Sequence, residues 1–196
     1  MFDFPSCFCS TKANPNAWKK LKGAGRRAWL TNTCLSIQPF PSNETFFLNP
    51  NIPNVSGLSE SDVYNAHVQV KVQCFPLHLI LLALNVTTVD FFSLDIEGNE
   101  LGVLETIPFD LITFKVFTIE YQFIRGGGKA VLREFMERAG FIFYRTVVKM
   151  MAENNACAID AIFIHRTVAA GLTGEELKMM GHEDVEPFVP KQRLKT

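Results

Sequence analysis

The residues most able to do chemistry are acids that follow a largely apolar segment in the middle of the chain. Residues 89–94 are followed by Asp95, and Glu97, Gly98 and Glu100 come directly after it. Closely spaced carboxylates can transfer protons, contact a cationic ligand or hold a divalent cation. Asp95 is the strongest candidate because it directly follows a predicted strand, and Gly98 allows the chain to turn closely over a ligand.

The two glutamates of this segment have a second interpretation. Glu97 and Glu100 lie at the beginning of a helical pattern, and acids in the first turn of a helix stabilise it through the helix dipole. We favour this structural role for Glu97 and Glu100 on the residues alone. Asp95 precedes the turn, so for Asp95 we favour a role in a site.

A second predicted strand also ends in an acid. Residues 114–121 are largely apolar, and Glu120 lies near their end. Because neighbouring parallel strands end at the same edge of a sheet, we expect Asp95 and Glu120 to lie beside each other. We predict no metal in this group, because no His or further Asp joins it by proximity in the sequence.

Hydrophobic periodicity predicts strands that alternate with helices. The predicted strands are residues 28–36, 44–50, 66–75, 89–95, 114–121, 141–148 and 157–166, and the predicted helices are residues 15–22, 76–84, 99–106 and 129–140. Residues 89–95 and 114–121 lack alternation, which is typical of strands buried on both faces of a parallel sheet. The last two strands are expected to form an antiparallel pair. The pattern therefore indicates an open α/β sheet, where ligands bind outside the carboxyl ends of the strands.

Composition places the chain among ordinary globular proteins. Its 196 residues are 47% hydrophobic and 20% charged, with a formal net charge of −1. This balance gives no electrostatic reason to expect a nucleic-acid partner, and no dense Lys/Arg patch occurs. The longest apolar stretch, residues 74–84, is about half as long as a bilayer-spanning helix needs to be, so we predict no membrane span.

The cysteines and the glycosylation sequons bear on the compartment. The five cysteines have no zinc-binding spacing. Cys34 and Cys74 lie on neighbouring predicted strands, so a disulfide between them is conceivable in a lumenal protein. The N-x-S/T sequons begin at Asn43, Asn54 and Asn85, and they raise the odds of a lumenal protein modestly.

The remaining motifs of the sequence do not indicate a catalytic or binding site. Gly23-Ala24-Gly25 follows a helix rather than a strand, so it does not meet the context of a nucleotide-binding loop. The four histidines are scattered, and none joins a Ser or Cys in a recognisable nucleophile motif. Thr173 and Glu176 form a capping box that predicts a short helix in the C-terminal tail.

The acidic segment resembles the FkbM-type methyltransferase domain. That family has an apolar strand ending in D-[IV]-E-G-x-E, then a helix, then a strand ending in Glu. Here S-L-D-I-E-G-N-E-L-G-V-L is followed by T-I-E. The matching positions are Asp95, Glu97, Gly98, Glu100, Leu101, Leu104 and Glu120. The resemblance extends over about residues 13–166.

The resemblance implies a fold and an activity. The fold is a Rossmann-like methyltransferase sheet, mostly parallel with an antiparallel C-terminal pair. The activity is transfer of a methyl group from S-adenosylmethionine to an oxygen nucleophile. By the family motif, Asp95 and Glu120 are the catalytic candidates, and Asp95, Glu97 and Gly98 are the cofactor-binding candidates.

The chain also departs from the family pattern. The family holds S-adenosylmethionine with a first strand and a Gly-rich loop, and neither is found before residue 13. We therefore expect a domain that is incomplete at its N-terminus. Residues 1–12 would be a degenerate strand, residues 13–166 a partial methyltransferase domain, and residues 167–196 a tail. Lys12 stands where the family has a Glu that grips the cofactor ribose.

Two further functions follow from the same resemblance. Arthropod members of the family include proteins similar to Star, an endomembrane protein that escorts growth-factor precursors out of the endoplasmic reticulum. The alternative function is thus a non-catalytic role in vesicle-mediated trafficking of client proteins in the endoplasmic reticulum or Golgi. A remnant without independent activity is the third possibility.

Overall fold

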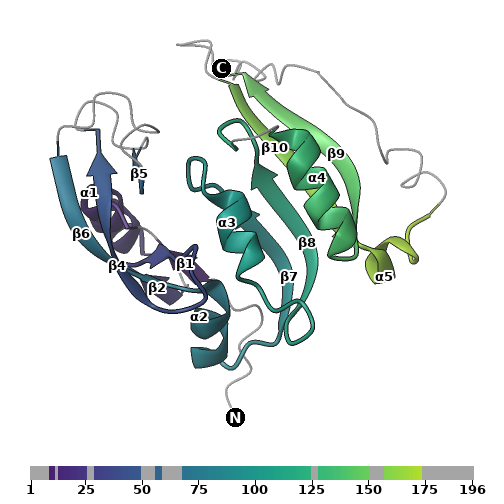
Figure 1. The fold of residues 1–196 in the computed structure, drawn as a ribbon, viewed down its shortest axis with the longest axis horizontal. Helices are drawn as coiled ribbons and strands as arrows, with labels where there is room; N and C mark the ends of the chain where they lie inside the picture. The colour runs from purple at the N-terminus through teal and green to yellow at the C-terminus, as the bar shows by residue number, and fades with distance from the viewer. Residues whose placement is uncertain are drawn as a thin grey trace, which may run out of the picture. The chain divides into compact units, whose positions relative to one another are not determined.

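The structure, a computed structural model, describes residues 9–11, 13–25, 29–49, 56–58, 68–124, 128–150 and 157–173. The chain divides into two compact units (Figure 1). The first unit is Met1–Val86 with Leu101–Pro108, and the second is Thr87–Glu100 with Phe109–Thr196. Each unit has its own sheet and its own buried apolar residues, so each is described by itself.

The first unit contains short strands, two complete helices and, from Leu101 on, most of helix α3 (Glu100–Glu105). Its elements are β1 (Cys9–Thr11), α1 (Pro15–Gly23), β2 (Trp29–Thr31), β3 (Cys34–Leu35), β4 (Ser42–Leu48), β5 (Ser56–Gly57), β6 (Val68–Phe75) and α2 (Leu77–Ala83). Strands β1 and β2 pair in parallel. The larger sheet has the order β3-β6-β4-β5, with β3 parallel to β6 and the other pairs antiparallel.

The predicted strand at residues 28–36 is two strands in the structure. Strand β2 pairs with β1, whereas β3 pairs with β6 in a different sheet. The chain changes partner between them, and the hydroxyl oxygens of Thr31 and Thr33 lie 3.3 Å apart across this break. The prediction of one continuous strand is therefore wrong, because two sheets divide the segment.

The first helix begins where its sequence predicts. The side-chain Oδ1 of Asn14 accepts a hydrogen bond from the backbone N of Ala17 at 3.3 Å, and Pro15 is the first helical residue. Asn14 is therefore the N-cap, as expected. Its Nδ2 also donates to Ser56 Oγ at 3.1 Å, which links the start of α1 to β5.

A disulfide joins Cys34 of β3 to Cys74 of β6, which confirms the pairing considered from the sequence. The two cysteines are register partners on adjacent strands, with Cα atoms 4.4 Å apart. Both are buried in a cluster with Ala13, Phe46 and Leu48. The bond therefore lies inside the apolar core of the first unit.

The second unit is built on a four-stranded sheet. Its elements are β7 (Thr88–Leu94), β8 (Thr113–Glu120), α4 (Lys129–Arg138), β9 (Phe141–Met150), β10 (Cys157–His165) and α5 (Arg166–Ala169). The strand order is β7-β8-β10-β9. Strands β7 and β8 are parallel, and β10 is antiparallel to both of its neighbours. The expected antiparallel pair is confirmed, but the described strands form mixed sheets rather than a mostly parallel one.

Phenylalanine side chains form the core of this unit. Phe114, Phe117, Phe141 and Phe163 are each no more than 1% exposed. The rings of Phe114 and Phe117 stack with centroids 4.8 Å apart, and the Phe117 and Phe141 rings meet edge to face at 5.2 Å. Such geometries add about 0.5–1.5 kcal/mol per pair beyond the area they bury.

Strand β7 is not buried on both faces, so that prediction is wrong. Among the described strands it lies at the edge of its sheet, and Phe91 is 60% exposed. Asp90 is also exposed, and it forms an ion pair with Lys115 of β8 at 2.7 Å. Strand β8 also exposes part of one face, since Lys115 is solvent-accessible while Phe114 and Phe117 are buried.

Helix α3 (Glu100–Glu105) follows β7, and helix α4 ends as predicted, with Gly140 in the left-handed region at φ 95°. The four-residue helix α5 was not predicted.

None of the described helices is long and apolar enough to cross a membrane. Lys12, Asn54 and the capping box partner Glu176 lie outside the described residues, and the proposed domain boundaries stay a prediction.

Replacing Cys34 and Cys74 with Ala should lower the free energy of unfolding by about 3–4 kcal/mol. The bond joins residues separated by 40 positions, and closing a loop of that size restricts the unfolded chain by about this amount. Urea unfolding followed by tryptophan fluorescence measures the change.

The control is a reducing agent, which should destabilise the wild-type protein and leave the double variant unchanged. Equal sensitivity of both proteins to reduction would contradict a disulfide at this position.

Candidate functional site

Acidic residues lie at the carboxyl ends of two parallel strands, at one edge of the second unit's sheet. Leu94 of β7 pairs in register with Ile119 of β8. Asp95 and Glu120 are the next residues on the two strands, so they meet at the carboxyl ends, as predicted. Carboxylate oxygens of Asp95, Glu97 and Glu120 all lie within 4.8 Å of one another. We call these three residues the carboxylate cluster.

Glu100 holds the turn that carries Asp95 and Glu97. Its Oε1 accepts a hydrogen bond from Ile96 N at 2.9 Å, and its Oε2 accepts one from Gly98 N at 3.0 Å. Glu100 is 1% exposed, so it does not face a ligand. Its role is structural, and it acts through these hydrogen bonds to the backbone as well as through its place in the first turn of α3.

The turn itself needs unusual backbone conformations. Glu97 has φ 62° and Gly98 has φ 106°. Glycine adopts the second of these values without the steric cost that a Cβ atom imposes. Gly98 therefore forms a turn as expected, its closeness to a ligand stays a prediction, and Glu97 takes a conformation that non-glycine residues rarely adopt.

Glu120 is the electrostatic centre of the cluster. Burial, the negative charges of Asp95 and Glu97, a hydrogen bond with Asp95 and the charge of Glu100 together raise the pKa of Glu120 to about 8, and burial is the largest cause. Its side chain is 8% exposed, and its Oε2 has no hydrogen-bond partner among the described residues. At neutral pH Glu120 therefore holds a proton that an ordinary carboxyl group would have released.

A fourth acid, Asp160, borders the cluster and was missed from the sequence. It is the register partner of Glu120 on the neighbouring strand β10. Burial raises the pKa of Asp160, and the charge of Asp95 adds to the effect. The available signal was an aspartate within an otherwise apolar strand, but its position beside Glu120 depends on the strand register.

The carboxylate cluster would stabilise a positively charged ligand. Asp95 and Glu120 form no ion pair with any Lys or Arg of the described residues. Carboxylate oxygens are ligands of Mg²⁺ and Ca²⁺, and they also attract organic cations. From the sequence we predict no metal at these acids, and that prediction is untested.

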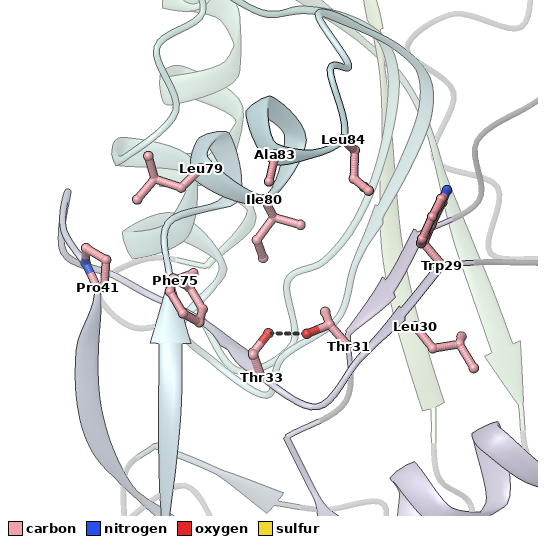
Figure 2. Close-up of a pocket in the computed structure, with 10 residues that line it drawn as sticks. All are labelled: Trp29, Leu30, Thr31, Thr33, Pro41, Phe75, Leu79, Ile80, Ala83 and Leu84. Atoms are coloured by element: carbon pink, nitrogen blue, oxygen red, sulfur yellow. Dashed lines mark hydrogen bonds between the residues drawn. The ribbon is translucent and has the colours of Figure 1, made fainter.

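The first unit has an apolar cavity that the sequence analysis did not identify (Figure 2). Its volume is about 440 Å³. Figure 2 shows Leu79 and Ile80 of α2 and its C-cap, Leu84, lining the cavity together with Trp29 of β2. All its lining side chains are uncharged, so it offers shape and apolar surface but no acid or base. The carboxylate cluster is therefore the better candidate for chemistry.

The mixed α/β fold, with acids at the carboxyl edge of two parallel strands, is consistent with a methyltransferase-like α/β protein. Residues 13–143 match the methyltransferase FkbM domain, so the chain belongs to this family. The match includes the whole carboxylate cluster. No curated protein and no solved structure matched the chain.

Replacing Glu100 with Ala should lower the free energy of unfolding by about 1–3 kcal/mol. The change leaves the backbone N–H groups of Ile96 and Gly98 without their acceptor, and each such loss carries a desolvation cost. Glu100→Gln is the matched control, because its amide oxygen can still accept one of the bonds. Urea unfolding followed by far-ultraviolet circular dichroism should place Gln between wild type and Ala, and an Ala variant as stable as wild type would contradict the structural role.

Glu120→Gln should change the pH dependence of stability. The pKa of Glu120 is about 8 in the folded protein against an ordinary value of 4.5. Between these values the folded protein keeps a proton that the unfolded chain releases. The contribution of Glu120 to the free energy of unfolding therefore falls as pH rises, by at most about 1.4 kcal/mol per pH unit.

The Gln variant has no such proton, so its stability relative to wild type should increase from pH 5 towards pH 8. Urea midpoints at several pH values measure this difference. Asp90→Asn, which changes an exposed acid of the same sheet, is the control and should run parallel to wild type. Parallel curves for Glu120→Gln and wild type would show that the pKa is not raised.

Proposed function

We propose that the chain transfers a methyl group from S-adenosylmethionine to an oxygen nucleophile at the carboxylate cluster. The observation that carries this proposal is the meeting of the Asp95, Glu97 and Glu120 carboxylates within 4.8 Å of one another, where Glu120 is buried and its pKa is raised to about 8. A general base is most effective when its pKa is close to the pH at which it acts. Membership of the FkbM family supports the choice of reaction.

The donor set of the cluster is compatible with the cofactor. S-adenosylmethionine supplies, when bound, an electrophilic methyl group on a positively charged sulfur. Burial and the negative charges of Asp95 and Glu97 raise the pKa of Glu120, so a cationic group beside Asp95 and Glu120 would be stabilised. Asp95 and Glu97 are the residues that would lie towards that charge.

Glu120 would act on the acceptor. In its ionised form, the carboxylate takes the proton from the acceptor hydroxyl as the oxygen attacks. Asp95 shares a hydrogen bond with Glu120 and repels its negative charge, so Asp95 keeps Glu120 basic enough to accept that proton. Glu100 and Gly98 position Asp95 and Glu97 and do not touch the reacting atoms.

A second candidate is a non-catalytic, Star-like role in trafficking client proteins through the endoplasmic reticulum or Golgi. The observation that favours it is the disulfide between Cys34 and Cys74, because disulfides persist in the oxidising secretory pathway and are rare in the cytosol. In that role the carboxylate cluster would be retained from the family fold and would have no catalytic function. Cofactor binding distinguishes the two candidates.

Calorimetric titration with S-adenosylmethionine and with S-adenosylhomocysteine tests the proposal. We expect micromolar binding of both, with S-adenosylmethionine favoured about two- to fivefold, because only it carries the sulfonium charge and Asp95 is solvent-exposed. Asp95→Asn should remove that preference. Asp90→Asn, which breaks only an exposed ion pair on the same strand, should keep it.

Absence of binding by a folded protein would exclude methyl transfer and favour the trafficking role. Binding without the charge preference would place the cofactor away from the cluster. In that case Glu120 would lose its role as the base.

A further inference from the structure

The segment that follows helix α2 combines a sequon with a defined turn. Leu84 is the C-cap of α2, and Asn85 adopts a left-handed conformation with φ 55°. Asn85 N donates to Leu82 O at 2.9 Å, and Val86 N donates to Leu81 O at 2.9 Å. This pair of bonds is the Schellman motif, in which the residue at the position of Asn85 is commonly Gly and sometimes Asn.

The geometry of the turn alone does not explain why Asn85 and Thr87 occupy these positions. Glycine would satisfy the same conformation at lower steric cost, and the turn makes no demand on the residue two positions later. That residue is Thr87, and it completes the sequon. Both Asn85 and Thr87 are exposed, and among the described residues the Thr87 hydroxyl has no hydrogen-bond partner, since Thr87 contributes only its carbonyl oxygen to Thr113 N.

The other described sequon provides a contrast. Asn43 lies within β4 and is paired in register with Gln73 of β6. The hydroxyl of Thr45, which completes that sequon, accepts a hydrogen bond from Lys71 Nζ at 2.7 Å. The backbone of Asn43 and the hydroxyl of Thr45 are therefore both bonded within the sheet. Asn85 lies in a surface turn, the location that suits a bulky, hydrated glycan.

A second observation concerns the compartment. The core of the first unit contains the disulfide between Cys34 and Cys74. Such a bond forms in an oxidising lumen, which is also where asparagine receives its glycan. The disulfide and the sequon lie on different elements, and they indicate the same environment independently of each other.

We propose that Asn85 is an N-glycosylation site. The donor is an oligosaccharide carried on a lipid diphosphate. Asn85 Nδ2 forms a bond to C1 of the first sugar, the bond between C1 and the phosphate oxygen breaks, and the lipid diphosphate leaves while the amide gives up one proton. The inference does not depend on whether the carboxylate cluster binds a cofactor.

The test uses the product of the natural gene, expressed in cultured eukaryotic cells and purified. Treatment with peptide N-glycosidase should increase its gel mobility and convert Asn85 to Asp, which peptide mass spectrometry detects. Thr87→Ala should abolish the conversion of Asn85 to Asp and reduce the mobility change by one glycan, while leaving the Schellman turn intact. Thr87→Ser should keep them, because it retains the hydroxyl of the sequon.

Asn43→Gln is the matched control and should leave the glycan on Asn85. Asn85→Gly removes the acceptor but keeps the turn, so its loss of glycan cannot be attributed to misfolding. An unmodified Asn85 in protein that contains the disulfide would overturn the proposal. Free thiols at Cys34 and Cys74 in the purified protein would also overturn it, because the chain would not have passed through an oxidising lumen.

Discussion

The hydrogen bonds from the backbone N–H groups of Ile96 and Gly98 to the buried carboxylate of Glu100 are the constraint on which the candidate site depends. They hold a turn whose backbone conformations, at Glu97 and Gly98, are intrinsically unfavourable for most residues. Burial raises the pKa of Glu100, while the same hydrogen bonds lower it, so the acceptor is kept in place against its own desolvation. This arrangement holds the backbone that places Asp95 and Glu97 beside the end of β8.

Like charges brought this close must be compensated. Asp95, Glu97 and Glu120 share a space of a few ångströms, and Asp160 adds a fourth acid from the adjacent strand. A proton on Glu120 is one way to reduce the repulsion, and a bound cation is another. In the proposed methyltransferase the same repulsion would serve two functions: it would attract a positively charged methyl donor, and it would make Glu120 a stronger base.

Local signals in the sequence predicted the parts of the fold that depend on near neighbours. Asn14 and Pro15 predicted the start of α1, and the two strands that end in acids predicted that Asp95 and Glu120 would meet. Features that depend on distant partners were missed. The apolar residues of β7 do not reveal that this strand lies at a sheet edge, and the position of Asp160 follows only from the register of β10 against β8. Likewise, residues 28–36 give no sign that the chain passes from one sheet to another.

The distribution of aromatic residues has a consequence for any optical study of this protein. Both tryptophans, Trp18 and Trp29, belong to the first unit, whereas the core of the second unit is built from phenylalanines that absorb and emit weakly. Tryptophan emission therefore reports on one unit alone. If the two units unfold separately, the emission curve will look like a single complete transition while the unit that carries the carboxylate cluster is still folded, and only a backbone signal such as circular dichroism will record both events.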